Sequence, residues 1–198
     1  MPDEASQQAG LEGVGMVKAW LESTTWMTLP MNAYEDADRC KVAYYGGSKK
    51  FDLSGYLHGP NKSRRNLWVE CKRYNSHGGQ HGEFMEFLAI AYSYTAKTIK
   101  EKGSCSDEFL WVTSHPFKTG EWPTLVSFAK IDAVMTDPAQ SAKLGGDQYD
   151  PDLARELAER VWLLVWCEKQ VNRLSLTREE LGKVMATLKR DGEPLWSR

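Results

Sequence analysis

The order of hydrophobic periodicities over residues 8–115 limits the fold of this chain more than any other feature. Apolar residues recur at helical spacing in two segments, 8–24 and 83–101. Short runs rich in apolar and β-branched residues, typical of strands, cover 41–45, 51–57, 66–74 and 109–113. The order helix, three strands, helix, strand predicts an α/β fold, because such elements bury their apolar faces by packing as layers.

The rest of the chain is expected to form a tail and an extension around this core. Residues 1–7 are predicted to be a disordered tail, and residues 28–40, which include Pro30, to be irregular. Residues 116–198 are predicted to form a C-terminal α/β extension packed on the core. Its expected elements are a helix within 123–135, a loop at 137–150, a helix at 153–160, an apolar strand at 161–166 and a helix at 177–189.

Charge is distributed unevenly along the sequence. The net charge of the chain is −2, which by itself argues against a nucleic-acid partner. Residues 41–73, however, hold eight Lys or Arg side chains against Asp52 and Glu70, a net charge of +6. A phosphate backbone responds to such a local basic field. The alternative interpretation is a solvated surface without a ligand.

Two features bear on the compartment. No apolar run approaches the roughly 20 residues of a membrane span, and the polar N-terminus lacks the pattern of a secretory signal, so a cytoplasmic location is expected. Cys40, Cys71, Cys105 and Cys167 form no CxxC pair. They are therefore expected to be reduced thiols and not a zinc site or a disulfide framework.

The residues with the clearest chemical meaning are Asp52, Glu70 and Lys72. Glu70 and Lys72 lie two apart in the strand-like run 66–74, so they share one face at a Cα separation of about 7 Å. If the strand that follows Asp52 pairs beside this run, two carboxylates and one ammonium meet at the end of the sheet. Two close carboxylates repel unless a cation intervenes, and Mg²⁺ prefers oxygen ligands.

This constellation resembles the PD-(D/E)XK nuclease superfamily, over roughly residues 8–115. The resemblance implies a restriction-endonuclease-like αβββαβ core, with a mixed central sheet flanked by helices. It also implies that Asp52, Glu70 and the Cys71 main-chain carbonyl bind Mg²⁺, for which Mn²⁺ can substitute, and that Lys72 assists the attacking water. Glu12 corresponds to an acid that many members place on the first helix, and Phe51 stands where the family often has proline. Gln80 and Tyr92 match further family residues only loosely.

The predicted function is therefore a Mg²⁺-dependent nuclease, with DNA favoured over RNA, in phage defence, restriction or repair. The residues expected to contact phosphates, which position a nucleic acid without reading its sequence, are Lys49, Lys50, Lys62, Arg64, Arg65 and Arg73. A homodimer or a partner protein subunit is compatible with this prediction.

Two alternatives remain open at the level of sequence. The first is a non-catalytic module of the same fold that binds nucleic acid or protein. The second is an interaction protein whose oligomer surface consists of Trp162, Trp166 and residues 163–165. His77 and His81 have the spacing of a helical metal site, but the intervening glycines oppose a helix there.

Overall fold

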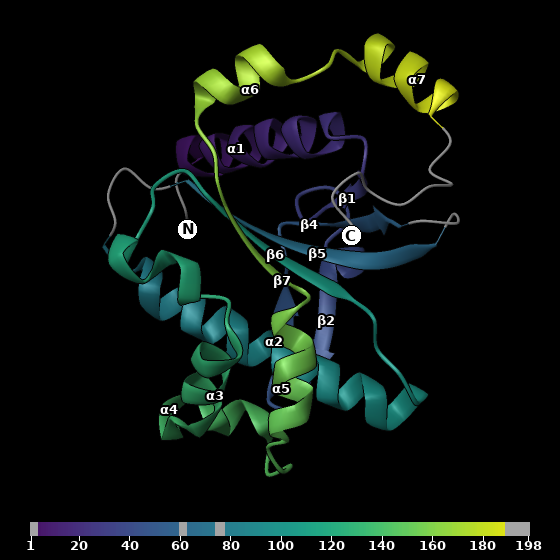
Figure 1. The fold of residues 1–198 in the computed structure, drawn as a ribbon. Helices are drawn as coiled ribbons and strands as arrows, with labels where there is room; N and C mark the ends of the chain where they lie inside the picture. Colours follow the sequence, from purple (N-terminus) through teal and green to yellow (C-terminus); the bar gives the residue numbers. More distant parts are fainter. Residues whose placement is uncertain (1–3, 60–62, 74–77, 189–198) are drawn as a thin grey trace.

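A five-stranded mixed sheet forms the centre of the molecule in the computed structural model, which describes residues 4–59, 63–73 and 78–188 (Figure 1). Its strands lie in the order β1-β4-β5-β6-β7. They are β1 Met27–Asn32, β4 Leu53–His58, β5 Arg64–Lys72, β6 Glu108–Thr113 and β7 Val161–Val165. The pairs β1–β4 and β4–β5 are antiparallel, whereas β5–β6 and β6–β7 are parallel. The α/β class and the mixed sheet predicted from the sequence are confirmed.

Helices cover both faces of this sheet (Figure 1). One face packs against α1 Glu4–Ser23 and α6 Glu168–Leu174, and α7 Arg178–Thr187 follows on the same side. The long α2 covers the other face together with the helices that follow β6. These elements are α2 Gln80–Lys102, η3 Thr119–Thr124, α3 Phe128–Thr136, α4 Pro138–Ser141, η4 Ala142–Leu144 and α5 Pro151–Ala158.

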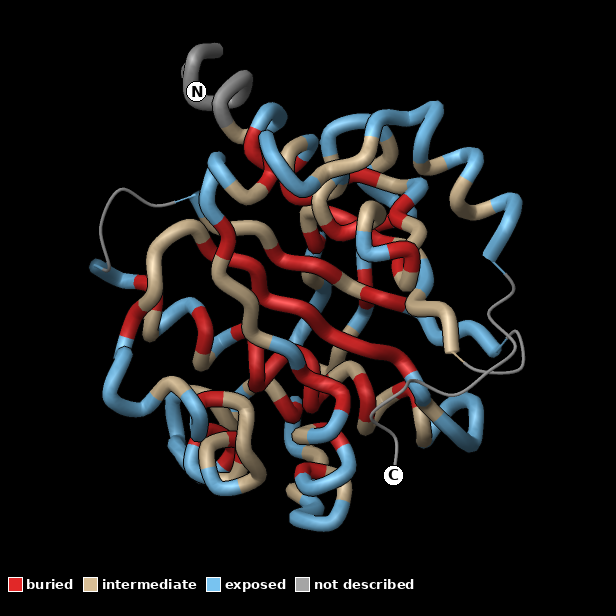
Figure 2. Tube along the Cα trace, turned by 45° about the horizontal axis from the view of Figure 1, so that its top comes forward, coloured by how far each residue is buried: buried red, intermediate tan, exposed pale blue. Residues whose placement is uncertain are grey.

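Two hydrophobic cores lie on the two faces of the sheet, and the alternation of side chains along β5 assigns residues to each. Leu67 and Val69 join the core beneath α1, whereas Trp68 packs in the core beneath α2. All six residues of β6 are buried, as expected for a strand with parallel neighbours and helices on both faces. Figure 2 shows these central strands as the most continuously buried part of the chain.

Several predicted boundaries are corrected. Helix α1 includes residues 4–7, which the sequence assigned to a disordered tail. Residues 27–32, expected to be mostly irregular, form β1. Pro30 is tolerated there because β1 is an edge strand with a register shift between Thr28 and Met31.

The predicted strand at 41–45 is present but does not join the main sheet. As β2, Lys41–Tyr44, it pairs with β3, Gly47–Lys50, in a separate two-stranded sheet. Val42 anchors this hairpin by packing into the core beneath α2. The three antiparallel strands of the central sheet are therefore β1, β4 and β5, and β2 is not one of them.

The predicted extension is continuous with the core. Strand β7 extends the central sheet beside β6, and the predicted loop at 137–150 contains α4 and η4. Asp137 starts α4, because its side chain accepts a hydrogen bond from the backbone of Ala139 and Pro138 occupies the first turn. Within the described ranges, no helix has the length and apolarity needed to cross a membrane.

Candidate functional site

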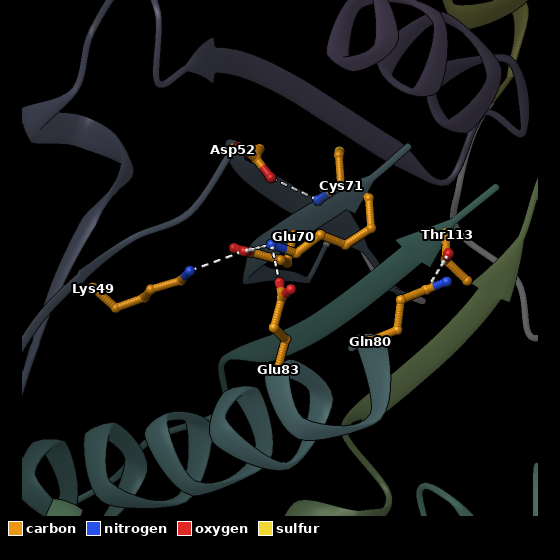
Figure 3. Close-up of polar contacts among 8 residues, drawn as sticks. Lys49, Asp52, Glu70, Cys71, Gln80, Glu83 and Thr113 are labelled. Carbon is orange, nitrogen blue, oxygen red and sulfur yellow. Dashed lines mark hydrogen bonds and ion pairs between the residues drawn. The ribbon is translucent and has the colours of Figure 1, made fainter. Parts of the chain in front are cut away.

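Asp52, Glu70 and Lys72 come together at the carboxyl end of β5, as the sequence predicts (Figure 3). Asp52 immediately precedes β4. Glu70 and Lys72 lie on the same face of β5, and Lys72 pairs with Glu83 of α2. Because β4 and β5 are antiparallel neighbours, the start of one lies beside the end of the other.

Phe51 fixes the segment that presents Asp52. The Phe51 ring is buried, and its centroid lies 6.0 Å from that of Trp68 and 6.2 Å from that of Phe87. The backbone nitrogen of Asp52 donates to the Val69 carbonyl at 3.0 Å, and its own carbonyl accepts from Ala33 at 2.9 Å. Rings on one side and backbone bonds on both sides leave Asp52 little freedom to move.

The Asp52 carboxylate is held close to the backbone of β5. Its Oδ2 atom accepts a hydrogen bond from the Cys71 backbone nitrogen at 2.7 Å (Figure 3). Burial raises the pKa of Asp52 from 3.8 to about 6, and the nearby Glu70 charge adds to the rise. The Cys71 N–H group, Lys72 and Lys49 oppose it. Asp52 therefore ionises at a cost that a bound cation would reduce.

Glu70 is a buried carboxylate between two ammonium groups. Its relative exposure is 4%. The Oε1 atom lies 2.9 Å from Lys49 Nζ and 3.0 Å from Lys72 Nζ. The Oε2 atom is also buried and has no hydrogen-bond partner among the described residues. A buried carboxylate oxygen without a partner is costly, so this atom marks a place where a cation or a donor would bind.

Lys72 connects the site to α2 and to β6. Its Nζ atom lies 2.8 Å from Glu83 Oε2 and 5.4 Å from the centre of the Trp111 ring. Burial favours loss of its proton, but Glu70 and Glu83 outweigh burial and raise the pKa of Lys72. Lys72 is thus a fixed positive charge at neutral pH and is poorly suited to accept a proton.

Two cavities flank the end of β5. One, of about 160 Å³, lies on the α2 side and is lined by Lys49, Glu70 and Trp111, among others. The other, of about 240 Å³, lies on the α1 side and includes Asp52 and Trp166 in its lining. Lys72 lines both cavities, so a ligand held there can reach into either.

The donor set for a metal ion is small. Asp52 and Glu70 supply two carboxylates, which is a sufficient protein contribution for Mg²⁺ when a phosphate and waters complete the shell. In the described ranges there is no group of three or more His, Cys, Asp or Glu side chains arranged to hold a metal. The Cys71 backbone contacts Asp52 through its N–H group, and a ligand role for its carbonyl stays a prediction. Glu12 is exposed and does not line the cavity beside α1, contrary to expectation.

The predicted phosphate-contacting residues lie in different places. Lys49 and Lys50 belong to β3, next to the site, although Lys49 is bound to Glu70. Arg64 and Arg65 begin β5, about 23 Å along the strand from Lys72. They are therefore not part of this site, because Arg64 and Arg65 lie at one end of β5 and the Glu70–Lys72 pair lies at the other.

Besides Lys49, two more of these predicted contacts form ion pairs with the protein itself. Arg65 lies 2.7 Å from Glu108 Oε1, a nearly fully buried carboxylate, and Arg73 lies 2.7 Å from Glu168 Oε1 on α6. Arg65 therefore stabilises the start of β6, and Arg73 links the end of β5 to α6. Lys62 and His77 lie outside the described residues.

Gln80 and Tyr92, which match the family only loosely, have structural partners. Gln80 accepts from the Thr113 hydroxyl at 2.7 Å and donates to the His115 carbonyl at 3.1 Å, so it joins the start of α2 to the end of β6 (Figure 3). Tyr92 contacts the backbone of Asp150 through its hydroxyl. His81 lies in the first turn of α2, with its ring centroid 6.4 Å from that of Phe117.

Three contributors to the site were not expected from the sequence. Glu83 pairs with Lys72 across the gap between α2 and β5. Trp166 and Tyr34 line the cavity on the α1 side. Trp166 is buried and Trp162 is 38% exposed, so the predicted oligomer surface that combined the two does not exist as one exposed face. An acid in the first helical turn was the available signal for Glu83, but its partner depends on how α2 packs.

Comparison of the sequence with known families and with curated proteins finds no match. Among solved structures, the chain is similar to a Moraxella osloensis Cap4 SAVED/CARF-domain containing receptor, with 12% identity and a TM-score of 0.40. It is also similar to an Acinetobacter baumannii Cap4 SAVED/CARF-domain containing receptor with the cyclic trinucleotide 3'3'3'-cAAA, with 12% identity and a TM-score of 0.36. These matches cover 91% and 88% of this chain but only 37% and 41% of those chains.

The prediction that this chain functions as a metal-dependent nuclease is corrected at this point. The similar structures are described as receptors, two of them with a cyclic trinucleotide, and none of these descriptions names a nuclease.

Proposed function

We propose that this chain is a non-catalytic binding module for a nucleic acid or a nucleotide, whose phosphate docks at the carboxyl end of β5. One observation supports this most directly. Glu70 is buried between Lys49 and Lys72 and keeps one oxygen without a partner, at the wall of a cavity. Such a cluster holds two cations in place and leaves one acceptor for a ligand-bound donor or cation.

The two lysines supply the positive charge that a phosphate requires. Lys72 stays protonated because of Glu70 and Glu83, and its side chain is still 22% exposed. Lys49 lies on β3 and also lines the cavity. A phosphate that approaches both ammoniums would share them with Glu70, and charge-assisted hydrogen bonds of this kind are stronger than neutral ones.

A divalent cation fits this arrangement and belongs to the proposal. Asp52 and Glu70 would hold Mg²⁺, and Mn²⁺ is expected to substitute for it. When bound, such an ion would supply positive charge that offsets the repulsion between the two carboxylates and favours a phosphate nearby. The unpartnered Oε2 atom of Glu70 and the raised pKa of Asp52 are the features of these residues that such an ion would relieve.

The finer description of the fold is likewise a proposal. We infer a restriction-endonuclease-like αβββαβ core from α1, the antiparallel strands β1, β4 and β5, helix α2, and β6 parallel to β5. The relation to the PD-(D/E)XK superfamily, the preference for DNA over RNA and an association with a second copy or a partner subunit stay predictions.

The test is ligand binding measured by fluorescence anisotropy. Fluorescein-labelled single-stranded and duplex DNA, single-stranded RNA and a cyclic trinucleotide, which is named for two of the similar structures, are titrated with the full chain in Mg²⁺ or in EDTA. Lys49→Met and Lys72→Met are each expected to weaken binding of the preferred ligand about tenfold or more, since each removes a charge-assisted hydrogen bond. Lys183→Met, on the exposed surface of α7, is the matched control.

The same samples decide between binding and hydrolysis. After each titration the ligand is analysed on a denaturing gel, and it is expected to be recovered intact. Metal-dependent cleavage that is lost in Asp52→Asn and Glu70→Gln would overturn the non-catalytic proposal and restore the enzyme class predicted from the sequence. Absence of binding by the folded wild-type chain to all the ligands would reject a nucleic-acid or nucleotide partner.

A further inference from the structure

The cavity on the α1 side of β5 has a composition unlike that of the phosphate site. It measures about 240 Å³ and is lined by two glycines and two valines of α1, together with Tyr34 and Trp166. The charged side chains at its border are Asp52, Lys72 and Arg73. An apolar and aromatic lining with a few polar groups is typical of a site for a flat organic ring.

Trp166 contributes a buried donor that has no partner. The residue is 1% exposed, and its Nε1 atom is buried without a hydrogen bond among the described residues. Indole N–H groups in a protein interior usually have a partner, because an unmade hydrogen bond is costly there. A ligand that presents an acceptor in this cavity would remove that cost.

Helix α1 leaves room for such a ligand. Gly10 and Gly13 line the cavity, where longer side chains would fill it. A Cβ atom at Gly10 would overlap the Tyr34 hydroxyl, and one at Gly13 would lie 3.4 Å from Arg73 Cδ. Tyr34 itself is 48% exposed, so its ring is accessible at the same cavity.

The cavity is connected to the phosphate site through β5. Lys72 lines both spaces, and Asp52 and Cys71 line the cavity on the α1 side. A ligand with a phosphate at Lys49 and Lys72 therefore has a neighbouring space for the group attached to it. In a nucleotide, that group is a sugar that carries a base.

We propose that this cavity is a base pocket, in which one unstacked nucleobase of the ligand accepts a hydrogen bond from Trp166 Nε1–H and contacts the Tyr34 ring. The inference rests on the proposed function, since it deepens the identity of the ligand at the same site. Base stacking on aromatic side chains tolerates different bases. We therefore expect the pocket to bind ligands with a base more tightly than abasic ligands, and to discriminate less between one base and another.

The experiment compares two oligomers with the same number of phosphates, labelled oligothymidylate and an abasic oligomer of equal length. Wild-type protein is expected to bind oligothymidylate about tenfold more tightly, a difference typical of one stacked base. Trp166→Phe, which removes the donor and keeps an aromatic ring, is expected to lose the part of this preference that the hydrogen bond supplies, about threefold or more, while its affinity for the abasic oligomer stays unchanged. Trp162→Phe is the matched control, because that indole donates to Glu108 at the start of β6.

The outcomes separate the two proposals. If wild type binds both oligomers equally, the base pocket is rejected and the phosphate site stands. If Trp166→Phe keeps the full preference, a water molecule and not a base satisfies the indole, and the inference is rejected. Should Trp166→Phe fail to fold, as judged by circular dichroism, Tyr34→Leu at the more exposed side of the cavity is the second variant and is expected to reduce the same preference. Failure of wild type to bind either oligomer rejects the proposed function itself.

Discussion

Asp52 Oδ2 lies 2.7 Å from the backbone nitrogen of Cys71, so the carboxylate that immediately precedes β4 is bound to the strand that carries Glu70. A single hydrogen bond from a backbone N–H group does not offset the cost of burying this ionised carboxylate. Burial and the Glu70 charge raise the pKa of Asp52 to about 6. The folded chain therefore favours the protonated form of Asp52 relative to the unfolded chain, and its ionised form lowers stability.

Asp52→Asn is expected to stabilise the metal-free protein at neutral pH. As pH rises from about 4 to about 6, unfolded Asp52 loses its proton before folded Asp52 does, so wild-type stability falls across this window. Asparagine does not titrate. The advantage of the variant should therefore appear over the same window and level off near roughly 3 kcal/mol at most, since one pKa unit corresponds to about 1.4 kcal/mol. Urea unfolding in EDTA at a series of pH values measures it.

Asp152→Asn is the control for that series, since its side chain is 85% exposed on α5. It is expected to change stability by less than about 0.5 kcal/mol at every pH. A stability difference between Asp52→Asn and wild type that is already complete at pH 4 would contradict the proposed origin of the effect.

Lys49 and Lys72 are expected to compensate for one another as partners of Glu70. Both ammoniums contact the same Oε1 atom, so Lys49→Met or Lys72→Met alone leaves Glu70 paired and should cost about 1 kcal/mol. The double variant leaves a buried charge without a cation and should cost about 3 to 5 kcal/mol. Chemical denaturation of the four proteins of this cycle gives the coupling energy, and simple additivity would show that the two lysines act independently.

The sequence was sufficient to place the three residues at the end of β5. The two-residue period of a strand puts Glu70 and Lys72 on one face, and the turn signals after residue 57 allow β4 to pair beside β5. These are local rules. The partners Lys49 and Glu83 depend instead on how the β2–β3 hairpin and α2 pack on the sheet, which local patterns do not determine.

The same distinction explains the errors in the fold. β1 was missed because Pro30 and nearby acids resemble a loop, and only its position at the edge of the sheet makes them tolerable. The run 41–45 was correctly predicted to be a strand but was assigned to the wrong sheet, because strand propensity contains no information on the pairing partner. Arg65 was expected to face a ligand, whereas its partner Glu108 is 43 residues away in the sequence.

Arg65 is expected to contribute to stability and not to ligand binding. Its guanidinium pairs with Glu108, whose second oxygen accepts from Trp162 Nε1 at 2.7 Å. Arg65→Met should lower the free energy of unfolding by about 1 to 3 kcal/mol, because a nearly fully buried carboxylate loses its cation. Arg64→Met, whose guanidinium lies over the Tyr56 ring, is the neighbouring control. A loss of oligonucleotide affinity in Arg65→Met with unchanged stability would return this residue to the binding surface.

Lys50 is expected to have opposite effects on stability and on ligand binding. It lies directly opposite Lys41 across the β2–β3 hairpin, on the face away from Lys49 and the core. Like charges in such a pair destabilise a hairpin, so Lys50→Thr should raise stability by roughly 0.2 to 1 kcal/mol at low salt. If the hairpin also contacts a phosphate, the same change should reduce the slope of log affinity against log salt by about one unit. Thermal melting and anisotropy at four salt concentrations measure both, and Lys102→Thr at the end of α2 is the control. An unchanged slope would remove the outer face of the hairpin from the ligand-binding surface.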